Sequence, residues 1–293
     1  MPGVEGRAVI VTGAGRGLGR SHALRLAAGG ALVLVNDPGV GREGGEQDSS
    51  PAQEVVAEIT AAGGTAVADH RDIATEDGAR GVVEAALEAF GRLDGVVNNA
   101  GILRDGTFHK TDPEQWRAVV RVHLDGSALV TMAAWPHLRE QRYGRVVMTT
   151  SGAGLFGNFG QANYAAAKLG VVGLMNTLAL EGARYGIRVN AVAPVALTRM
   201  TAGLLDASTD LDPAWVSAAV GWLCGEECEL SAEIVRVHGP HYSRVRLVES
   251  LGVDFPEPPT DDALTARWNE IADLTGARPG QAAVAVARRA ASG

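Results

Sequence analysis

The sequence predicts an α/β fold, namely a doubly wound Rossmann domain with a parallel, seven-stranded sheet. Apolar runs typical of buried strands alternate with helical patterns along most of the 293 residues. A glycine-rich turn joins the first of these runs to the first helical segment. Polar residues follow several of the runs at the point where the strand should end, which is where a sheet of this kind binds its ligand.

The expected elements follow one another in the order that a doubly wound sheet requires. Residues 8–12 and 31–36 are short apolar runs, and the segment between them has a helical pattern. Each later run is also short and leads into a longer stretch with helical spacing. The expected strands are 8–12, 31–36, 65–69, 95–98, 145–150, 188–192 and 234–238, and the expected helices are 17–28, 51–62, 75–90, 112–138, 163–185 and 212–224.

Glycines follow the first expected strand directly. Gly13, Gly17 and Gly19 lie between that strand and the first helix, so the chain can turn tightly there. Backbone N–H groups of this turn, including those of Arg16 and Leu18, can approach a pyrophosphate at the helix N-terminus. Because a strand precedes the turn and a helix and a second strand follow it, the pattern indicates a dinucleotide site.

An acidic residue ends the second expected strand. Asp37 can hydrogen-bond both hydroxyls of an adenosine ribose, and its charge would repel a 2′-phosphate. Arg16 is the opposing signal, because a guanidinium in the glycine loop could pair with that phosphate. We expect Asp37 to decide the selection, so NAD is the predicted cofactor and NADP is less favoured.

Three polar side chains have the spacing of a proton-transfer site. Ser151 directly follows the strand expected at 145–150, and Tyr164 and Lys168 lie four residues apart in an Ala-rich segment. On a helix the last two share one face, so the ammonium can lie near the phenol. A free phenol has a pKa of about 10, and a nearby cation favours the phenolate, which would make Tyr164 a usable base.

The sequence resembles the short-chain dehydrogenase/reductase family. The matching residues are Thr12, Gly13, Gly17, Gly19, Asp72, Ile73, Asn98, Asn99, Ala100, Gly101, Ser151, Tyr164, Lys168, Pro194 and Thr198, in the family's order. By this resemblance the position of residues 72–73 holds the adenine, and the run 98–101 supports the central strand beside the cofactor. The residues after Pro194, with Thr198, hold the nicotinamide amide.

The resemblance also implies the chemistry of an alcohol dehydrogenase. Ser151 holds the substrate oxygen, Tyr164 takes the hydroxyl proton, and Lys168 lowers the pKa of the tyrosine and grips the nicotinamide ribose. Where this chain has His123, most members carry an Asn in a water relay that connects the lysine to solvent. An imidazole can donate and accept, so His123 either serves that relay or only packs while the relay water binds the backbone. Val195 replaces a common Gly, and the backbone contacts to the nicotinamide should survive it.

A narrower set of residues is similar to the (R)-3-hydroxyacyl-CoA dehydrogenase unit of multifunctional enzyme type 2, also called 17β-hydroxysteroid dehydrogenase type 4. The set comprises residues 35–37, 98–105, 121–124, 157–164 and 222–224, together with an insertion at 38–50. The likeness favours an NAD-dependent 3-hydroxyacyl-CoA dehydrogenase of fatty-acid or steroid side-chain β-oxidation. The alternatives are a 17β-type hydroxysteroid dehydrogenase and a non-catalytic nucleotide-binding scaffold. The complete set of Ser151, Tyr164 and Lys168 speaks against the scaffold.

One dehydrogenase domain is expected over residues 1–250, followed by a C-terminal extension at 251–293. A Pro-rich stretch at 256–259 precedes an amphipathic stretch at 261–274. The extension is either a solvated tail with a helix, or a segment that docks on a neighbouring subunit or shapes the substrate mouth.

The substrate mouth is expected beside residues 201–211. This segment covers the substrate in the family, and here it is short, which favours an open cleft for a long thioester or a flat steroid. Arg104 and Arg199 near the cleft could meet CoA phosphates or could be solvated surface charges.

Composition limits the possible partners. A net charge of −8 argues against nucleic acid and anionic membranes. No apolar run reaches the roughly 18 uncharged residues that span a bilayer, and residues 291–293 are not a Ser-Lys-Leu address, so we expect a cytoplasmic protein. No metal site is expected, because Cys224 and Cys228 lack completing ligands and His238 and His241 flank a turn. The family resemblance implies a homodimer or homotetramer, often formed through the long helices after the fourth and fifth strands.

Overall fold

The computed structural model describes residues 3–39, 50–196 and 210–280. The chain divides into two compact units, Met1–Arg244 and Val245–Gly293. The predicted domain boundary at residue 250 stays a prediction. The segment predicted to cover the substrate, residues 201–211, lies outside the described residues except at its last two positions.

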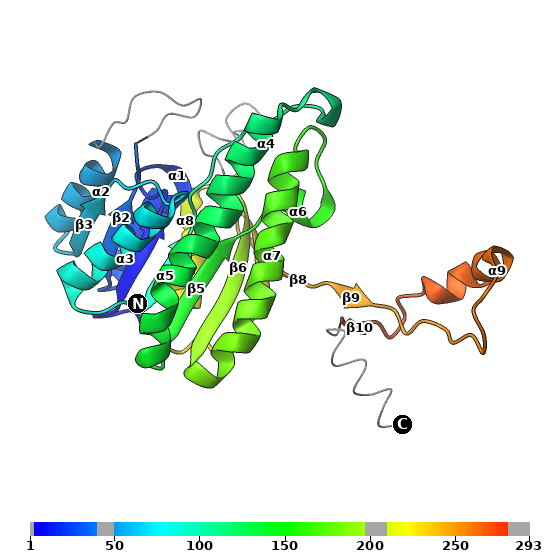
Figure 1. Cartoon of the computed structure of the whole chain (residues 1–293). Coiled ribbons are helices and arrows are strands. Elements are labelled where there is room, and N and C mark those ends of the chain that lie inside the picture. The colour runs from blue at the N-terminus through cyan, green and yellow to red at the C-terminus, as the bar shows by residue number, and fades with distance from the viewer. Residues whose placement is uncertain (1–2, 40–49, 197–209, 281–293) are drawn as a thin grey trace. The chain divides into compact units, whose positions relative to one another are not determined.

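The first unit is built around one eight-stranded sheet. The strands are β1 (Ala8–Thr12), β2 (Leu32–Asn36), β3 (Thr65–Asp69), β4 (Gly95–Asn98), β5 (Gly144–Thr149), β6 (Ile187–Val195), β7 (Ile234–His238) and β8 (His241–Val245). They lie in the order β3-β2-β1-β4-β5-β6-β7-β8, and β1 to β7 pair in parallel (Figure 1). The Rossmann fold and the seven predicted strands are confirmed.

The predicted number of strands was wrong by one. β8 follows β7 after only Gly239 and Pro240, a connection too short for a parallel pair, so the two strands form a hairpin. Gly239 has a φ of +54°, which residues with a side chain rarely adopt. The flanking residues His238 and His241 belong to the strands themselves.

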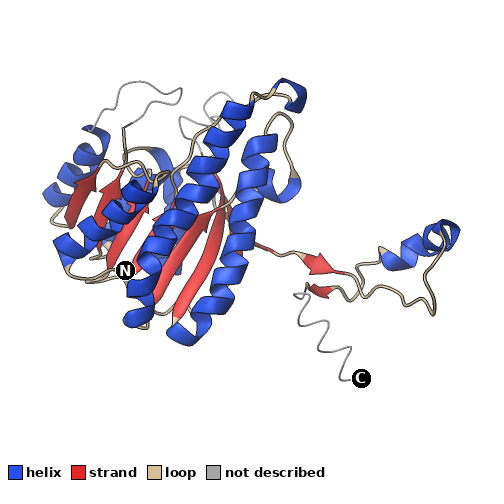
Figure 2. Ribbon diagram, in the orientation of Figure 1, coloured by secondary structure: helices blue, strands red, loops and turns tan. Residues whose placement is uncertain are grey.

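Helices cover both faces of the sheet, as Figure 2 shows. One face carries α1 (Gly17–Ala28), α2 (Ser50–Ala61) and α8 (Pro213–Cys224), and the other carries α3 (Glu76–Phe90), α5 (Gly126–Glu140) and α7 (Ala162–Gly182). Two 3₁₀ turns also occur in the described part of the first unit: η1 (Phe108–Lys110) precedes α4 (Pro113–Val120), and η3 (Ala183–Tyr185) follows α7. Thr75, Asp112 and Asp212 each accept a backbone N–H at the start of the helix that follows, which fixes where that helix begins.

The helix predicted over 112–138 is interrupted. α4 (Pro113–Val120) passes into a π-helical turn, η2 (Arg121–Asp125), before α5 begins. Turns of this kind are rare and occur often at functional sites. A short helix, α6 (Gly152–Phe156), was also not predicted; the hydroxyl of Ser151 accepts a backbone N–H and caps it.

The sheet order creates a switch point at the carboxyl ends of β1 and β4. β2 and β3 lie on one side of β1, and β4 to β8 lie on the other. Every residue of β1, β4 and β5 is buried, so these strands form a rigid base. Doubly wound sheets bind their ligands at such a switch point.

The second unit holds little regular structure in its described part. It contains β9 (Val248–Glu249), α9 (Asp261–Ile271) and β10 (Arg278–Pro279), and β9 pairs antiparallel with β10. The amphipathic stretch predicted at 261–274 is helical as far as Ile271, and none of the α9 residues is buried. Within residues 3–39, 50–196 and 210–280 no helix is both long and apolar enough to cross a membrane.

Candidate active site

The carboxyl end of β5 and the first turns of α7 form the candidate active site. Ser151 lies just beyond β5, and Tyr164 and Lys168 lie on successive turns of α7. Ser151 lies close enough to the Tyr164 phenol to act on its pKa as a hydrogen-bonding group. Lys168 Nζ lies 5.6 Å from the centre of the Tyr164 ring. The structure therefore brings together the three side chains that the sequence pattern singles out.

Lys168 is held by the end of β5. Its Nζ donates to the carbonyl of Thr149 at 2.6 Å, and the hydroxyl of Thr150 donates to the carbonyl of Lys168 at 2.7 Å. The side chain is almost fully buried, with 3% exposure. Burial disfavours the charged ammonium and lowers the pKa of Lys168 to about 7. Near neutral pH this lysine is poised between its charged and neutral forms.

The ionisation of Tyr164 differs from the expectation. Burial raises the pKa of Tyr164 above its ordinary value, the hydrogen bond from Ser151 opposes that rise, and the charge of Asp105 adds to it. A lowering of the phenol pKa by Lys168 was predicted and is not seen in this structure. The reason is physical: removing the phenol from water has a larger effect than any charge near it, and the spacing of residues in a sequence does not reveal burial.

His123 lies on the π-helical turn and contacts the same cluster. Its ring packs edge-to-face on Tyr164, with the ring centres 5.1 Å apart. The imidazole Nε2 lies 3.1 Å from the backbone N and 2.8 Å from the carbonyl O of Ile102. Burial, then the charge of Lys168, lowers the pKa of His123 well below its ordinary value, so the ring is neutral.

The second ring nitrogen of His123 is a free position. Nδ1 is buried and has no hydrogen-bond partner among the described residues. A methyl group on Gly101 would lie 2.2 Å from the imidazole Cε1, so only glycine at that position leaves room for the ring. The arrangement is compatible with both roles that the sequence left open for His123, a relay or packing alone.

The glycine loop forms a cradle at the end of β1, and side chains at its glycines would not fit against the neighbouring backbone. A methyl group on Gly19 would lie 2.2 Å from the carbonyl O of Gly13, and one on Gly13 would lie 2.7 Å from the Ala100 Cα. The Asn99 side chain donates to the carbonyls of Thr12 and Gly13 at 3.0 and 3.1 Å. The loop is therefore fastened to the end of β4 at the switch point, where a dinucleotide pyrophosphate would fit.

Asp37 is beside this loop. Its Oδ2 accepts from the backbone N of Gly15 at 2.8 Å, and its Oδ1 accepts from the backbone N of Gly39 at 2.8 Å. The carboxylate thus stands at the end of β2, next to the glycine turn, as an adenosine-ribose ligand requires. Arg16 is the residue before α1. The donors and acceptors present fit a nicotinamide dinucleotide.

The remaining predicted residues surround the same edge. Ile73 is buried, whereas Asp72 is exposed and accepts from the backbone N of Ala74 at 2.9 Å. Pro194 is partly buried near the end of β6. The other residues predicted to contact the cofactor are Gly17 and Leu18, at the start of α1, and Thr198, which lies outside the described residues together with Arg199.

Two residues without a predicted role hold Tyr164 in place. Asn163 Oδ1 accepts from the backbone N of Tyr164 at 2.7 Å, and Asn163 Nδ2 donates to the carbonyl of Arg104 at 3.0 Å. Gln161 donates to Asp105 at 2.9 Å. The segment before α7 is therefore tied to residues 104–105. Both segments belong to the narrower resemblance, which was the available signal for their importance.

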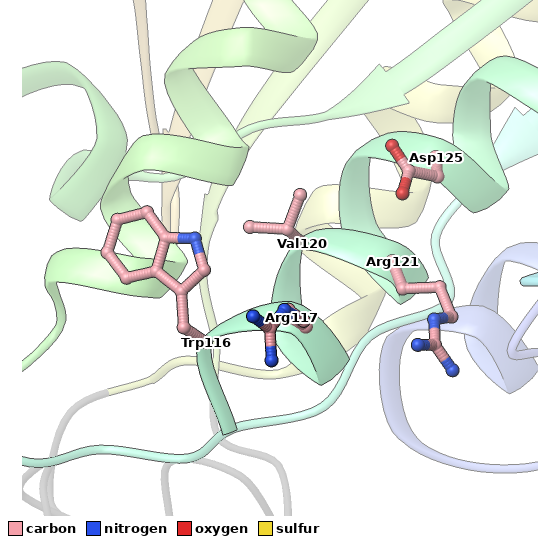
Figure 3. Close-up of a pocket in the computed structure, with 5 residues that line it drawn as sticks. All are labelled: Trp116, Arg117, Val120, Arg121 and Asp125. Carbon is pink, nitrogen blue, oxygen red and sulfur yellow. The ribbon is translucent and has the colours of Figure 1, made fainter. Parts of the chain in front are cut away.

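The first unit also has a pocket of about 260 Å³ (Figure 3). It is lined by Trp116, Arg117, Val120, Arg121 and Asp125, all on α4 and η2. None of the predicted site residues lines it. Cys224 and Cys228 are free, buried thiols, and in the described part of the chain no group of three metal-ligating side chains lies together.

A Rossmann sheet with a glycine cradle at its switch point and a Ser-Tyr-Lys cluster at the same edge defines a nucleotide-dependent oxidoreductase. Residues 7–208 match the short chain dehydrogenase family, and the chain belongs to this family. Members act on CH–OH groups with NAD or NADP.

Relatives extend the match over nearly the whole chain. Rv0148 of Mycobacterium tuberculosis, named a short-chain type dehydrogenase/reductase, is 55% identical over 95% of this chain and 98% of its own length. Peroxisomal multifunctional enzyme type 2 of Mus musculus is 47% identical over 93% of this chain but only 37% of its own length. The chain thus spans about a third of that larger protein.

Solved structures agree with the fold. A short chain dehydrogenase from Mycobacterium avium has a TM-score of 0.83 and 42% identity, covering 94% of this chain and 97% of its own. Full-length peroxisomal multifunctional enzyme type 2 from Drosophila melanogaster has a TM-score of 0.79 and 35% identity, covering 98% of this chain and 48% of its own. The resemblance to multifunctional enzyme type 2 inferred from the sequence is confirmed.

The low pKa of Lys168 can be measured directly. The chain contains only two lysines, Lys110 and Lys168. In protein labelled with ¹³C-lysine, the Lys168 Cε signal should titrate with a midpoint near 7, because its ammonium is buried against Thr149. The variant Lys110→Arg removes the other signal and so assigns the spectrum. A Lys168 signal that stays fully protonated at pH 9 would contradict this description.

Proposed function

We propose that this protein is an NAD-dependent dehydrogenase that converts 3-hydroxyacyl-CoA to 3-oxoacyl-CoA. The observation that carries the proposal is the cluster of Ser151, Tyr164 and buried Lys168 beside the glycine cradle. The identity to multifunctional and hydratase-dehydrogenase-epimerase enzymes, 47% in Mus musculus and 44% in Saccharomyces cerevisiae, supports dehydrogenation of an acyl thioester. Fold alone would not support a substrate.

Each catalytic side chain has a role that its surroundings support. The hydroxyl of Ser151 donates to the substrate oxygen and orients the carbinol carbon. Tyr164 removes the hydroxyl proton as the C–H bond breaks, and we propose that Lys168 favours the phenolate once the dinucleotide is bound, against the effect of burial. When bound, the dinucleotide supplies the acceptor for the departing hydride, and its positive ring adds to the field that favours a phenolate.

Lys168 also needs a route for its proton. We propose that His123 provides it through a water at the unpartnered Nδ1. The ring is neutral, so one nitrogen can accept while the other donates. Its contact with Tyr164 places it within the catalytic cluster.

Asp37 supports NAD rather than NADP. Its carboxylate is held beside the glycine loop by the backbone N–H groups of Gly15 and Gly39. A ribose hydroxyl can donate to this carboxylate, whereas a 2′-phosphate would meet like charge there.

Exposed apolar side chains support assembly into a homodimer or homotetramer through α5 and α7. Met132 on α5 is 67% exposed, and Leu180 on α7 is 76% exposed. Arg121 and Asp125 are exposed on the preceding π turn and offer opposite charges to a two-fold related copy. The expected cytoplasmic location remains a prediction, since several relatives are peroxisomal by name.

Replacing Tyr164 tests the reaction. Initial rates of NADH formation are measured with racemic 3-hydroxybutanoyl-CoA and NAD, and again with a 17β-hydroxysteroid. Tyr164→Phe should lower turnover on the thioester by about 10²–10⁴-fold, because the proton acceptor is lost, while NAD binding stays nearly unchanged. Tyr185→Phe, at a partly buried tyrosine that accepts from Arg139 away from the candidate site, serves as the control. Turnover of the steroid alone, or substantial oxidation by Tyr164→Phe, would refute the assignment.

Replacing Asp37 tests the cofactor choice. Dissociation constants for NAD and NADP are compared in the natural protein and in Asp37→Ser. NAD should bind better to the natural protein, and the variant should lose about tenfold or more of its NAD affinity, because a hydrogen bond to a charged group contributes about 1.5–3 kcal/mol. Equal affinity of the natural protein for the two cofactors would show that Asp37 does not select between them.

A further inference from the structure

An arginine on β7, two strands away from β5 in the sheet, lies near the candidate active site. Val235 and Val237 pack into the core on the face covered by α1 and α8. Alternate residues of a strand point to opposite faces, so the side chain of Arg236 leaves β7 on the other face. There its guanidinium lies over the ring of Phe156, 5.4 Å from the ring centre, at the end of α6.

The guanidinium borders open space beside Ser151. Gly152 is the first residue of α6 and directly follows Ser151. Among the described residues, a methyl group built on Gly152 would have Arg236 Nη2 at 3.9 Å as its only non-local neighbour within 4 Å. The charge therefore stands within roughly 9 Å of the Ser151 Cα, because consecutive Cα atoms are about 3.8 Å apart. The absent side chain of Gly152 leaves room for a ligand between them.

Arg236 has no polar partner in the described part of the chain. Its one described interaction is the contact with Phe156, although the residue is partly buried. Two other arginines of the first unit are satisfied: Arg244 pairs with Glu233, and Arg145 donates to four backbone carbonyls. A guanidinium is a donor-only group, and a partly buried one without an acceptor is suited to receive one from a ligand.

We propose that Arg236 binds an oxygen on C1 of the substrate, two carbons from the carbon that is oxidised. This inference rests on the proposed function and deepens it. With the C3 oxygen on Ser151 and Tyr164, the C1 carbonyl oxygen of a 3-hydroxyacyl thioester points into the space beside Gly152 and accepts from the guanidinium. A ring alcohol flanked by hydrocarbon has no such oxygen, so Arg236 favours β-oxygenated acyl substrates over steroids.

Four substrates distinguish a contact between Arg236 and the C1 oxygen from a contact between Arg236 and the CoA phosphates. Racemic 3-hydroxybutanoyl-CoA and its N-acetylcysteamine thioester share the C1 carbonyl, but only the first carries phosphates. Free 3-hydroxybutanoate offers a carboxylate at C1, and 2-butanol offers no C1 oxygen. Steady-state kinetics are measured for the natural protein, Arg236→Met, Arg236→Lys and the control Arg80→Met, whose arginine is exposed on α3 beside Asp77.

The expected result is a loss that depends on the C1 oxygen. Arg236→Met should lower kcat/KM for both thioesters by the same factor, about tenfold to a hundredfold, through a higher KM. Arg236→Lys should recover part of the loss, and the rate with 2-butanol should not change, which also shows that the variant folds. Arg80→Met should match the natural protein with every substrate.

Other results overturn the inference in distinguishable ways. A loss confined to the CoA thioester would mean that Arg236 meets phosphate instead, and an equal loss with 2-butanol would mean a structural role. No loss with any substrate would also refute it. If the natural protein oxidises 3-hydroxybutanoate in an Arg236-dependent manner but neither thioester, the proposed function fails and the role of Arg236 stands. Oxidation of 2-butanol or a steroid alone overturns both.

Discussion

The site depends on a lysine ammonium buried at the end of a central strand. Thr149 accepts from the Lys168 ammonium, and Thr150 donates to the Lys168 carbonyl, so the last residue of β5 and the residue after it dock α7. Because burial removes this ammonium from water and disfavours its charge, the pKa of Lys168 is lowered to about 7. The same docking places Tyr164 one turn earlier on α7, next to Ser151. Removing the lysine would therefore alter both the electrostatics and the position of the helix.

Close packing around this helix explains several glycines. A methyl group on Gly154 of α6 would lie 2.7 Å from the Lys168 Cβ, and one on Gly101 would overlap the His123 ring. Small residues at these points let α6, α7 and the π turn approach one another. The result is a cluster in which Tyr164 touches Ser151, His123 and Lys168 within one compact region.

Local patterns predicted the order of the elements and most of the site. The strands, the glycine loop and the spacing from Ser151 to Lys168 all reside in short stretches of sequence, where periodicity and turn chemistry decide the structure. Properties set by distant parts of the chain were not predictable. The π turn at 121–125 interrupts a pattern that reads as one helix, and the hairpin after β7 depends on a single turn. The raised pKa of Tyr164 follows from burial, and the approach of Arg236 to Gly152 joins segments far apart in the sequence.

The ionisation of Tyr164 is the most direct test of this account. Ultraviolet difference titration of the tyrosines is performed with and without NAD, and Tyr164→Phe identifies the signal among the four tyrosines. In the protein alone the pKa of Tyr164 should lie above the ordinary value. Bound NAD should lower it, and the fall should be smaller in Lys168→Met. A Tyr164 pKa that does not respond to NAD, or that falls equally in Lys168→Met, would contradict the role assigned to the buried lysine.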